Sequence, residues 1–441
     1  MVAWGLLNIG IVIISMFLAS PIGYAVGVNV GNLNKYFMFS LVAWIMVALL
    51  RNLAPLRLPA AIILMSLVQI WFTVSSVVSQ IQLSRSLDFS APDYSLMSFL
   101  LCFIQGSMLT YFAPHVRVLL KRLVVGLAIV SAFVAILQFL GFGPAIAYAN
   151  LMIAFQDITD WAGQGGIRAS GIFGGLVLQS SYCLIGIGMI ASALYSRKLT
   201  GLEIATIILL TGIMFMAQVR SMLVVIAIVM ISLVVFFVRK HRMSAMPYVV
   251  LGTLALVLLI LKGGDRFDYM FSGDTSTFDW RTDVLWPQAW HIYAERPWFG
   301  VGVEPDFIGV RTFVTGLWSS GYIMDNGYLV ALAFGGLPAL ALLIMTVIAA
   351  VFSSIKLLLR RTAQPIDQAF ALTAVIVTLL FGYGMYFNNL YTNISSGMLY
   401  FILIGAALPS RPSIGRSPKK SGGPPDAIDG RQATVTAASN E

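Results

Sequence analysis

The chain has 441 residues, of which 59% are hydrophobic and only 10% are charged, and its mean hydropathy is +0.89. A soluble globular domain carries about 25% charged residues, so this composition excludes a water-soluble protein and predicts a polytopic membrane protein. The net charge of +9 comes as short basic clusters between apolar runs. This pattern is typical of membrane topology and argues against a nucleic-acid partner.

Twelve apolar stretches approach the ~20 residues that a helix needs to cross a hydrocarbon core. They cover about 4–19, 36–50, 58–80, 94–113, 123–141, 171–195, 202–218, 222–238, 246–261, 325–352, 367–386 and 392–408. The stretches lack the period-two alternation of a barrel, so the predicted fold class is all-α. No basic residue precedes the first stretch, so we expect a retained helix and not a cleavable signal peptide.

The basic residues predict the orientation. With the N-terminus inside, eighteen of the 27 Lys and Arg fall in short inner connections and in the C-terminal tail. The other nine are spread over much longer outer segments. By the positive-inside rule, both termini are therefore predicted to be cytoplasmic, and the expected location is the bacterial inner membrane.

This topology divides the chain into four parts. Residues 1–261 hold the first nine spans, and residues 262–324 form the one long polar interval, a predicted periplasmic loop with short amphipathic helices. Residues 325–408 hold the last three spans. Residues 409–441 are rich in Pro, Ser, Gly, Lys and Arg, which predicts a disordered cytoplasmic tail.

Four arginines on the outer side are candidate anion ligands: Arg168, Arg220, Arg266 and Arg281. Charges near the outer interface are costly and usually face a polar cavity. One alternative is that each side chain snorkels to the lipid headgroups or caps a helix. The other is that they converge on a phosphate-containing ligand, because the guanidinium group suits bidentate contact with phosphate oxygens.

Within the large loop, helical spacing begins after Asp279 and stops at Pro297, with Pro287 as a predicted kink. Its aromatic residues, including Trp286 and Trp290, form either a face packed on the membrane surface or a platform for sugar rings. Glu304 and Asp306 follow in a glycine-containing turn, and His291 is the one outer histidine. The histidines, cysteines (Cys102 and Cys183) and carboxylates have no metal-ligand spacing, so no metal and no cofactor is expected.

Taken together, short motifs in the second half of the chain resemble the O-antigen ligase and Wzy-type polysaccharide polymerase superfamily. The motifs are Arg168–Phe173, Gln218–Ser221, Trp280-Arg281, Pro297–Gly302, Asp325–Leu329 and Gly335–Leu337. The order of elements is also similar, with a large periplasmic loop between the ninth and tenth spans. The resemblance implies that Arg281, Arg168 and Arg220 bind the diphosphate of an undecaprenyl-linked glycan.

The resemblance also points to a catalytic position at the start of the tenth span. Ligases of this superfamily place a histidine immediately before the Asn that opens this span, whereas this chain has Asp325 before Asn326. Asp325 is thus the first candidate for a general base, with His291, Glu304 and Asp306 in reserve. The alternative is that Asp325 only caps the helix. The predicted sugar-binding residues are Trp286, Trp290, Glu304, Asp306 and Asn326.

The leading prediction is a metal-independent, inverting glycosyltransferase that polymerises undecaprenyl-diphosphate-linked oligosaccharide units, which serve as donor and acceptor, into exopolysaccharide or O-antigen. Two alternatives remain: a ligase that transfers glycan to another acceptor, and a flippase or transporter of lipid-linked oligosaccharide. The chain shows no internal repeat, which counts against transporter folds built from two related halves. A chain-length regulator, a separate flippase and membrane lipid are the other partners considered.

Overall fold

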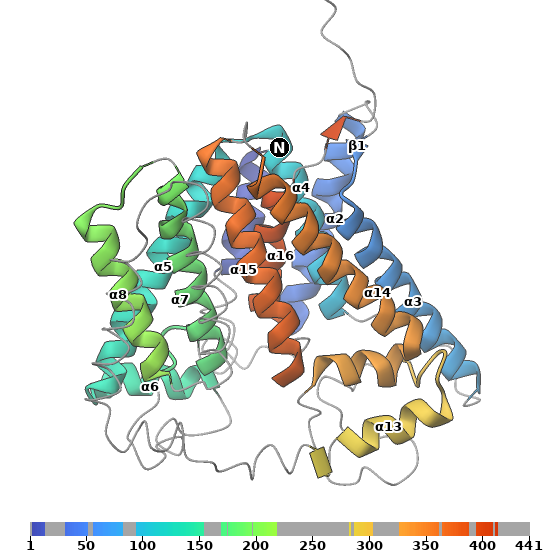
Figure 1. Cartoon of the computed structure of the whole chain (residues 1–441). Coiled ribbons are helices and arrows are strands. Elements are labelled where there is room, and N and C mark those ends of the chain that lie inside the picture. Colours follow the sequence, from blue (N-terminus) through green and yellow to red (C-terminus); the bar gives the residue numbers. More distant parts are fainter. Residues whose placement is uncertain are drawn as a thin grey trace, which may run out of the picture.

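The structure is a computed structural model and is almost entirely helical (Figure 1). It describes residues 2–13, 31–51, 56–82, 94–153, 169–173, 175–195, 197–217, 282–283, 286–302, 326–360, 364–387, 394–408 and 411–412. Within these residues, five helices are long and apolar enough to cross a membrane. The protein is therefore a multi-pass membrane protein.

Ten of the twelve predicted stretches coincide with described helices, while 222–238 and 246–261 lie outside the described residues. The helices are an N-terminal helix (Val2–Ile13), α2 (Gly31–Arg51), α3 (Ala60–Gln82), α4 (Tyr94–Phe112), α5 (Val116–Phe139), α6 (Gly143–Ile153), α7 (Leu176–Ala191) continued by the 3-10 turn η2 (Ser192–Tyr195), α8 (Gly201–Met216), α13 (Trp286–Glu295), α14 (Gly327–Leu358), α15 (Pro365–Phe387) and α16 (Ile394–Ala407).

Burial separates central helices from peripheral ones. In the apolar windows of the helices that contain α7 and α15, 89% and 83% of the residues are buried, whereas α3, α5 and α14 have 33–39%. α7 and α15 therefore lie inside the bundle, and the peripheral helices turn apolar side chains outward, as lipid-facing helices do. In Figure 1, α3 and α14 run side by side along one flank. On the opposite side, α7 packs against α5, α8 and α15.

Helix α14 is broken near its start. Gly336 has φ 68° and ψ −168°, a conformation that is essentially restricted to glycine. Pro338 lies in the first turn of the following segment, where the missing N–H of proline costs little. The predicted span 325–352 is thus two helices, a short one that ends at Gly335 and a long one that starts after the break.

Helix α6 was not predicted, because its eleven residues are too few for a span. It follows Gly141, whose positive φ ends α5, and it lies across one end of the bundle (Figure 1).

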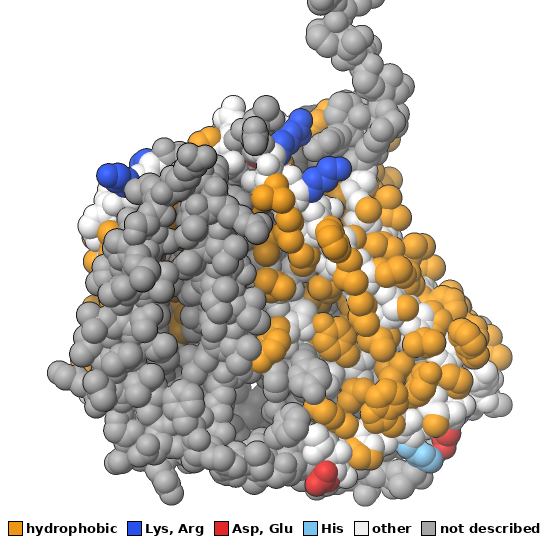
Figure 2. Space-filling view, viewed as in Figure 1, with side chains coloured by type: hydrophobic (Ala, Val, Ile, Leu, Met, Phe, Trp, Pro, Cys, Tyr) orange, Lys and Arg blue, Asp and Glu red, His pale blue; other side chains and the backbone are white. Residues whose placement is uncertain are grey.

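The two ends of the bundle differ in charge. The end at which α8 begins and α14 ends carries Arg197, Lys198, Lys356 and Arg360, and we call it the basic end. Figure 2 shows Lys and Arg side chains there, and acidic and histidine side chains at the opposite end. The N-terminus also lies at the basic end (Figure 1).

A short strand pairing brings the region after α16 to the same end. Strand β1 (Leu56–Arg57) pairs antiparallel with β2 (Arg411–Pro412) just before α3. Arg411 and Pro412 therefore have a fixed partner, while residues 409–410 and 413–441 of the predicted tail lie outside the described residues.

Candidate active site

The predicted site residues fall into two groups. Trp286, Trp290, His291 and Asn326 are described, and all four belong to elements at the end opposite the basic end. The other predicted site residues lie outside the described residues: Arg168, Arg220, Arg266, Arg281, Glu304, Asp306 and Asp325. The described part of the candidate site therefore consists of the first four residues and the segments that adjoin the others.

Helix α13 is described from Trp286, so Pro287 lies at the start of its described part. The predicted kink at Pro287 stays a prediction, because residues 284–285 before it lie outside the described residues. Trp286 and Tyr293 pack against the hydrophobic core, whereas Trp290 is 54% exposed and touches Tyr293 edge-on. Trp286 and Tyr293 thus contribute to packing, whereas the exposed ring of Trp290 is accessible to a ligand.

His291 is exposed on α13, and its Nε2 lies 3.2 Å from Oε1 of Glu295, one helical turn later. Its side chain is 61% exposed and is therefore accessible to solvent. No described contact brings His291 next to Asn326.

The segment after α13, residues 296–302, which we call the strap, is bound to the break in α14. Val301 N donates to Ala333 O and Gly302 N donates to Phe334 O, both at 2.9 Å, and Leu337 N donates to Pro297 O at 2.8 Å. The break leaves the last carbonyls of the short helix and the first N–H groups of the long helix without intrahelical partners. The strap supplies partners for both.

Glycines permit this close contact. Gly300, Gly302 and Gly336 all have positive φ. A Cβ on Gly336 would overlap the carbonyl of Trp298, and one on Gly302 would come within 2.7 Å of Ser76 Cα in α3. The motifs Pro297–Gly302 and Gly335–Leu337 are therefore two halves of one packing contact.

Helix α3 completes the contact. Trp71 Nε1 donates to Gly335 O at 2.7 Å, and the Trp71 ring stacks on Phe299 with centroids 5.2 Å apart. The base of the large loop is thus fixed to both α3 and α14.

A second fixed segment, residues 169–173, which we call the pinned loop, follows Arg168. Gln138 of α5 accepts hydrogen bonds from Ser170 N and Gly171 N at 3.0 and 2.9 Å, and its amide donates to Gly171 O. Ser131 accepts from Ile172 N at 3.0 Å. These buried amide and hydroxyl groups replace the backbone partners that a helix would otherwise provide.

The pinned loop also contacts the end of α8. Ala169 N donates to Met216 O at 3.4 Å. Arg168 directly precedes Ala169, and Arg220 follows Met216 by four residues. Two of the predicted anion-binding motifs are thus joined through the backbone next to them.

Asn326 is the N-cap of α14. Its Oδ1 accepts from Tyr328 N and Leu329 N at 3.0 and 3.1 Å, and the residue is only 3% exposed. The capping role considered for Asp325 therefore belongs to the next residue. This correction removes helix capping as a reason for an acidic residue at position 325.

Arg296 was not among the predicted site residues, although it is the first residue of the strap. Its Nη1 is buried and has no hydrogen-bond partner among the described residues. An unpaired buried guanidinium nitrogen is costly, so an anionic partner would stabilise it. The signal that could have revealed it is a basic residue between two motifs of the loop.

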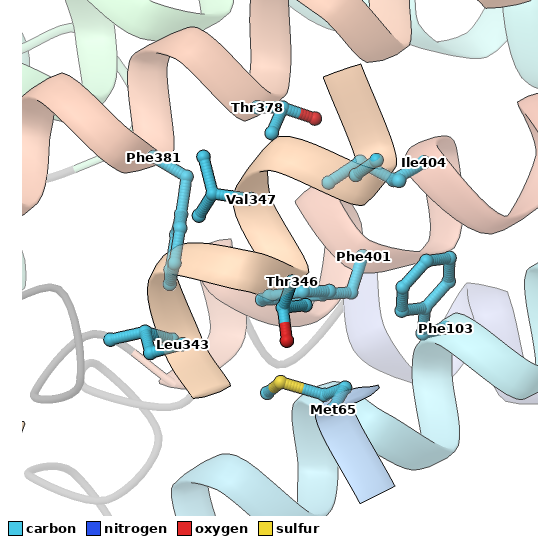
Figure 3. Close-up of a pocket in the computed structure, with 10 residues that line it drawn as sticks. Met65, Phe103, Leu343, Thr346, Val347, Thr378, Phe381, Phe401 and Ile404 are labelled. Carbon is cyan, nitrogen blue, oxygen red and sulfur yellow. The ribbon is translucent and has the colours of Figure 1, made fainter. Parts of the chain in front are cut away.

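One small cavity lies inside the bundle, among α3, α4, α14, α15 and α16 (Figure 3). Its walls are apolar apart from Thr346 and Thr378, whose hydroxyls donate to the carbonyls of Leu342 and Ala374 in their own helices. It has room for about one water molecule, so it is not a substrate site.

The strap and the break in α14 lie in the part of the chain that matches a known family model, whereas α3 and the pinned loop lie outside it. Residues 205–344 match the family model Wzy_C, described as O-Antigen ligase. The matched range begins within α8, contains α13, the strap and the break in α14, and ends within α14. It confirms the resemblance at the level of a domain of membrane enzymes in polysaccharide biosynthesis. No curated protein matches the chain.

Proposed function

We propose that this protein polymerises undecaprenyl-diphosphate-linked oligosaccharide units into exopolysaccharide or O-antigen on the outer face of the inner membrane. The observation that carries the proposal is the match of residues 205–344 to the O-antigen ligase domain, because this range contains Arg220, Arg266, Arg281 and Asp325. The end of the bundle opposite the basic end would then face the periplasm, with both termini in the cytoplasm.

Chain connectivity supports a shared arginine site. The hydrogen bond from Ala169 N to Met216 O, together with four further residues, limits the distance between the Cα atoms of Arg168 and Arg220 to roughly 25 Å at full extension. Two long guanidinium side chains reaching toward each other across such a span can contact one diphosphate group. Arg296, with its buried unpaired nitrogen, joins Arg281 as a second candidate arginine from the large loop.

The proposed reaction is attack of an acceptor sugar hydroxyl on the anomeric carbon of the donor. The new glycosidic bond forms as the bond to the undecaprenyl diphosphate breaks, and the anomeric centre is inverted. Arginines stabilise the charge that develops on the leaving diphosphate. Asp325 takes the proton from the acceptor hydroxyl. It directly precedes Asn326, the N-cap of α14.

A cellular experiment separates the proposal from transport. Cells carrying Arg281→Ala should lose the polymer while single lipid-linked units accumulate on the periplasmic side. Accumulation of those units on the cytoplasmic side would instead indicate that the protein moves them across the membrane.

A ligase is the second candidate, because the family model is described as O-Antigen ligase. Asp325 at the position of the ligase histidine favours polymerisation. The product distinguishes the two: a polymerase returns a longer chain to the lipid diphosphate, whereas a ligase moves the chain to another acceptor.

A further inference from the structure

The long segment of α14 carries a stripe of exposed apolar side chains along one face. Its members lie three, four or seven residues apart: Leu337, Ile344, Ile348, Phe352, Ile355 and Leu359. At about 1.5 Å per residue the stripe is about 33 Å long. This length is close to the ~30 Å of a hydrocarbon core. The stripe therefore marks the depth of the membrane, with Leu337 at one boundary and Lys356 and Arg360 near the other.

Helix α3 widens this surface. It packs beside α14 and exposes its own face of Ile63, Leu67, Ile70, Val74 and Ile81. Figure 2 shows hydrophobic side chains over this flank down to the level at which acidic side chains and histidine begin. A hydrophobic flank of this extent is expected to face lipid.

Trp298 lies at the outer end of the stripe. It is 64% exposed, and its carbonyl lies against Gly336, the residue before Leu337. Its backbone is held, because Pro297 O accepts from Leu337 N and Gly300 N donates to Arg296 O. The next residue, Phe299, turns inward to stack on Trp71. The exposure of Trp298 is thus a property of a fixed strap.

We propose that Trp298 is a membrane anchor that holds the strap at the boundary between hydrocarbon and headgroups. The indole ring is apolar but carries one N–H donor, so tryptophan favours this boundary. The partner is the lipid surface itself. The anchor fixes the depth at which the large loop meets the membrane. The inference requires a membrane-spanning chain and does not rest on the proposed glycosyl transfer.

Spin labelling of the full-length protein in lipid bilayers tests the anchor. Cys102 and Cys183 are both buried and are replaced by serine to give a background without other thiols. Trp298→Cys is then labelled and compared with Ile348→Cys in the lipid-facing stripe and Glu295→Cys on exposed α13. The readout is the accessibility of each label to oxygen, which partitions into lipid, and to a water-soluble nickel chelate.

The anchor predicts intermediate accessibility for the label at position 298. This label should be more accessible to oxygen than the label at 295 and more accessible to the nickel chelate than the label at 348. Accessibility equal to that at 295 would overturn the proposal, as would accessibility equal to that at 348. If the cysteine variant misfolds, wild type and Trp298→Phe are compared by tryptophan fluorescence with brominated lipids. The tryptophan fluorescence that wild type has and Trp298→Phe lacks comes from Trp298. Bromine near the headgroups should quench this fluorescence more than bromine near the chain ends, and the reverse order would overturn the proposal.

Discussion

The two ends of the bundle are held together by different chemistry. At the basic end, Arg197 donates to both carboxylate oxygens of Glu203, at 2.8 and 2.6 Å, and Glu203 also forms a capping box with Thr200. Arg117 pairs with Asp367 between α5 and α15. At the opposite end, the strap and the pinned loop are held by backbone, amide and hydroxyl hydrogen bonds and by glycine contacts.

The comparison explains how one chain can use arginine for two purposes. At the basic end, carboxylates of the fold neutralise Arg117 and Arg197, so these arginines serve structure. At the other end, uncharged groups hold the backbone, and Nη1 of Arg296 is buried without a hydrogen-bond partner among the described residues. Under the proposed function, arginines at this end bind the anionic donor. Five predictions test this division, from the largest expected effect to the smallest.

Arg281→Ala should lower the rate of chain extension by about 10²-fold or more, because a group that stabilises leaving-group charge is lost. The matched control is Arg197→Ala, which removes the same charge from the basic end and should leave the rate nearly unchanged. The rate is measured with lipid-linked oligosaccharide in proteoliposomes. Equal losses in the two variants would remove the distinction between the ends.

Gly336→Ala should destabilise the protein by about 1–3 kcal/mol or more, because alanine is strained at this φ and ψ and its Cβ meets the Trp298 carbonyl. Gly126→Ala in α5 is the control, since nothing lies within 4 Å of its added Cβ and alanine favours a helix. Thermal unfolding in detergent compares them. A Gly336 variant as stable as the Gly126 variant would contradict the account of the strap.

Gln138→Leu should destabilise the pinned loop by about 1–3 kcal/mol for each backbone group left without a partner. Tyr148→Phe, which removes a single bond to Ile172 O, should cost less, about 1 kcal/mol. Hydrogen exchange at residues 169–173 reports the loosening. If Gln138→Leu leaves the exchange unchanged, the amide does not hold the loop.

Asn326→Ala should destabilise the protein by about 1 kcal/mol through the lost N-cap, whereas Asn326→Asp keeps a capping oxygen. The pair also separates capping from sugar binding. If Asn326 acts only as a cap, Asn326→Asp retains activity and stability together. A loss of activity with full stability would show that its amide nitrogen contacts substrate.

Glu203→Gln should have the smallest effect, because the pair with Arg197 is exposed to solvent and exposed pairs contribute little. The hydrogen bond to Glu203 raises the pKa of Arg197, which favours its charged form. A small fall in melting temperature at low salt should vanish at high salt. A fall that persists at high salt would show that the charge of the pair is not the stabilising feature, since glutamine can still complete the capping box.

Much of the fold could be predicted because span length and hydropathy dominate in this chain, as α3, α7 and α15 illustrate. The break in α14 could not, since Gly335 through Pro338 lie inside an uninterrupted apolar stretch and the strap that stabilises the break is distant in sequence. Adjacent Asp325 and Asn326 are both good caps, so sequence alone could not assign the cap. The motifs around Gly300 and Gly336 carried part of the resemblance to a family but gave no sign that they touch each other.

The most direct test of the central claim is chain extension by the purified protein in proteoliposomes with defined undecaprenyl-diphosphate oligosaccharide as the only substrate. The account predicts longer lipid-linked chains with an inverted new linkage, formed without added nucleotide and in the presence of a metal chelator. Transfer of the glycan across the bilayer without any new glycosidic bond would contradict it.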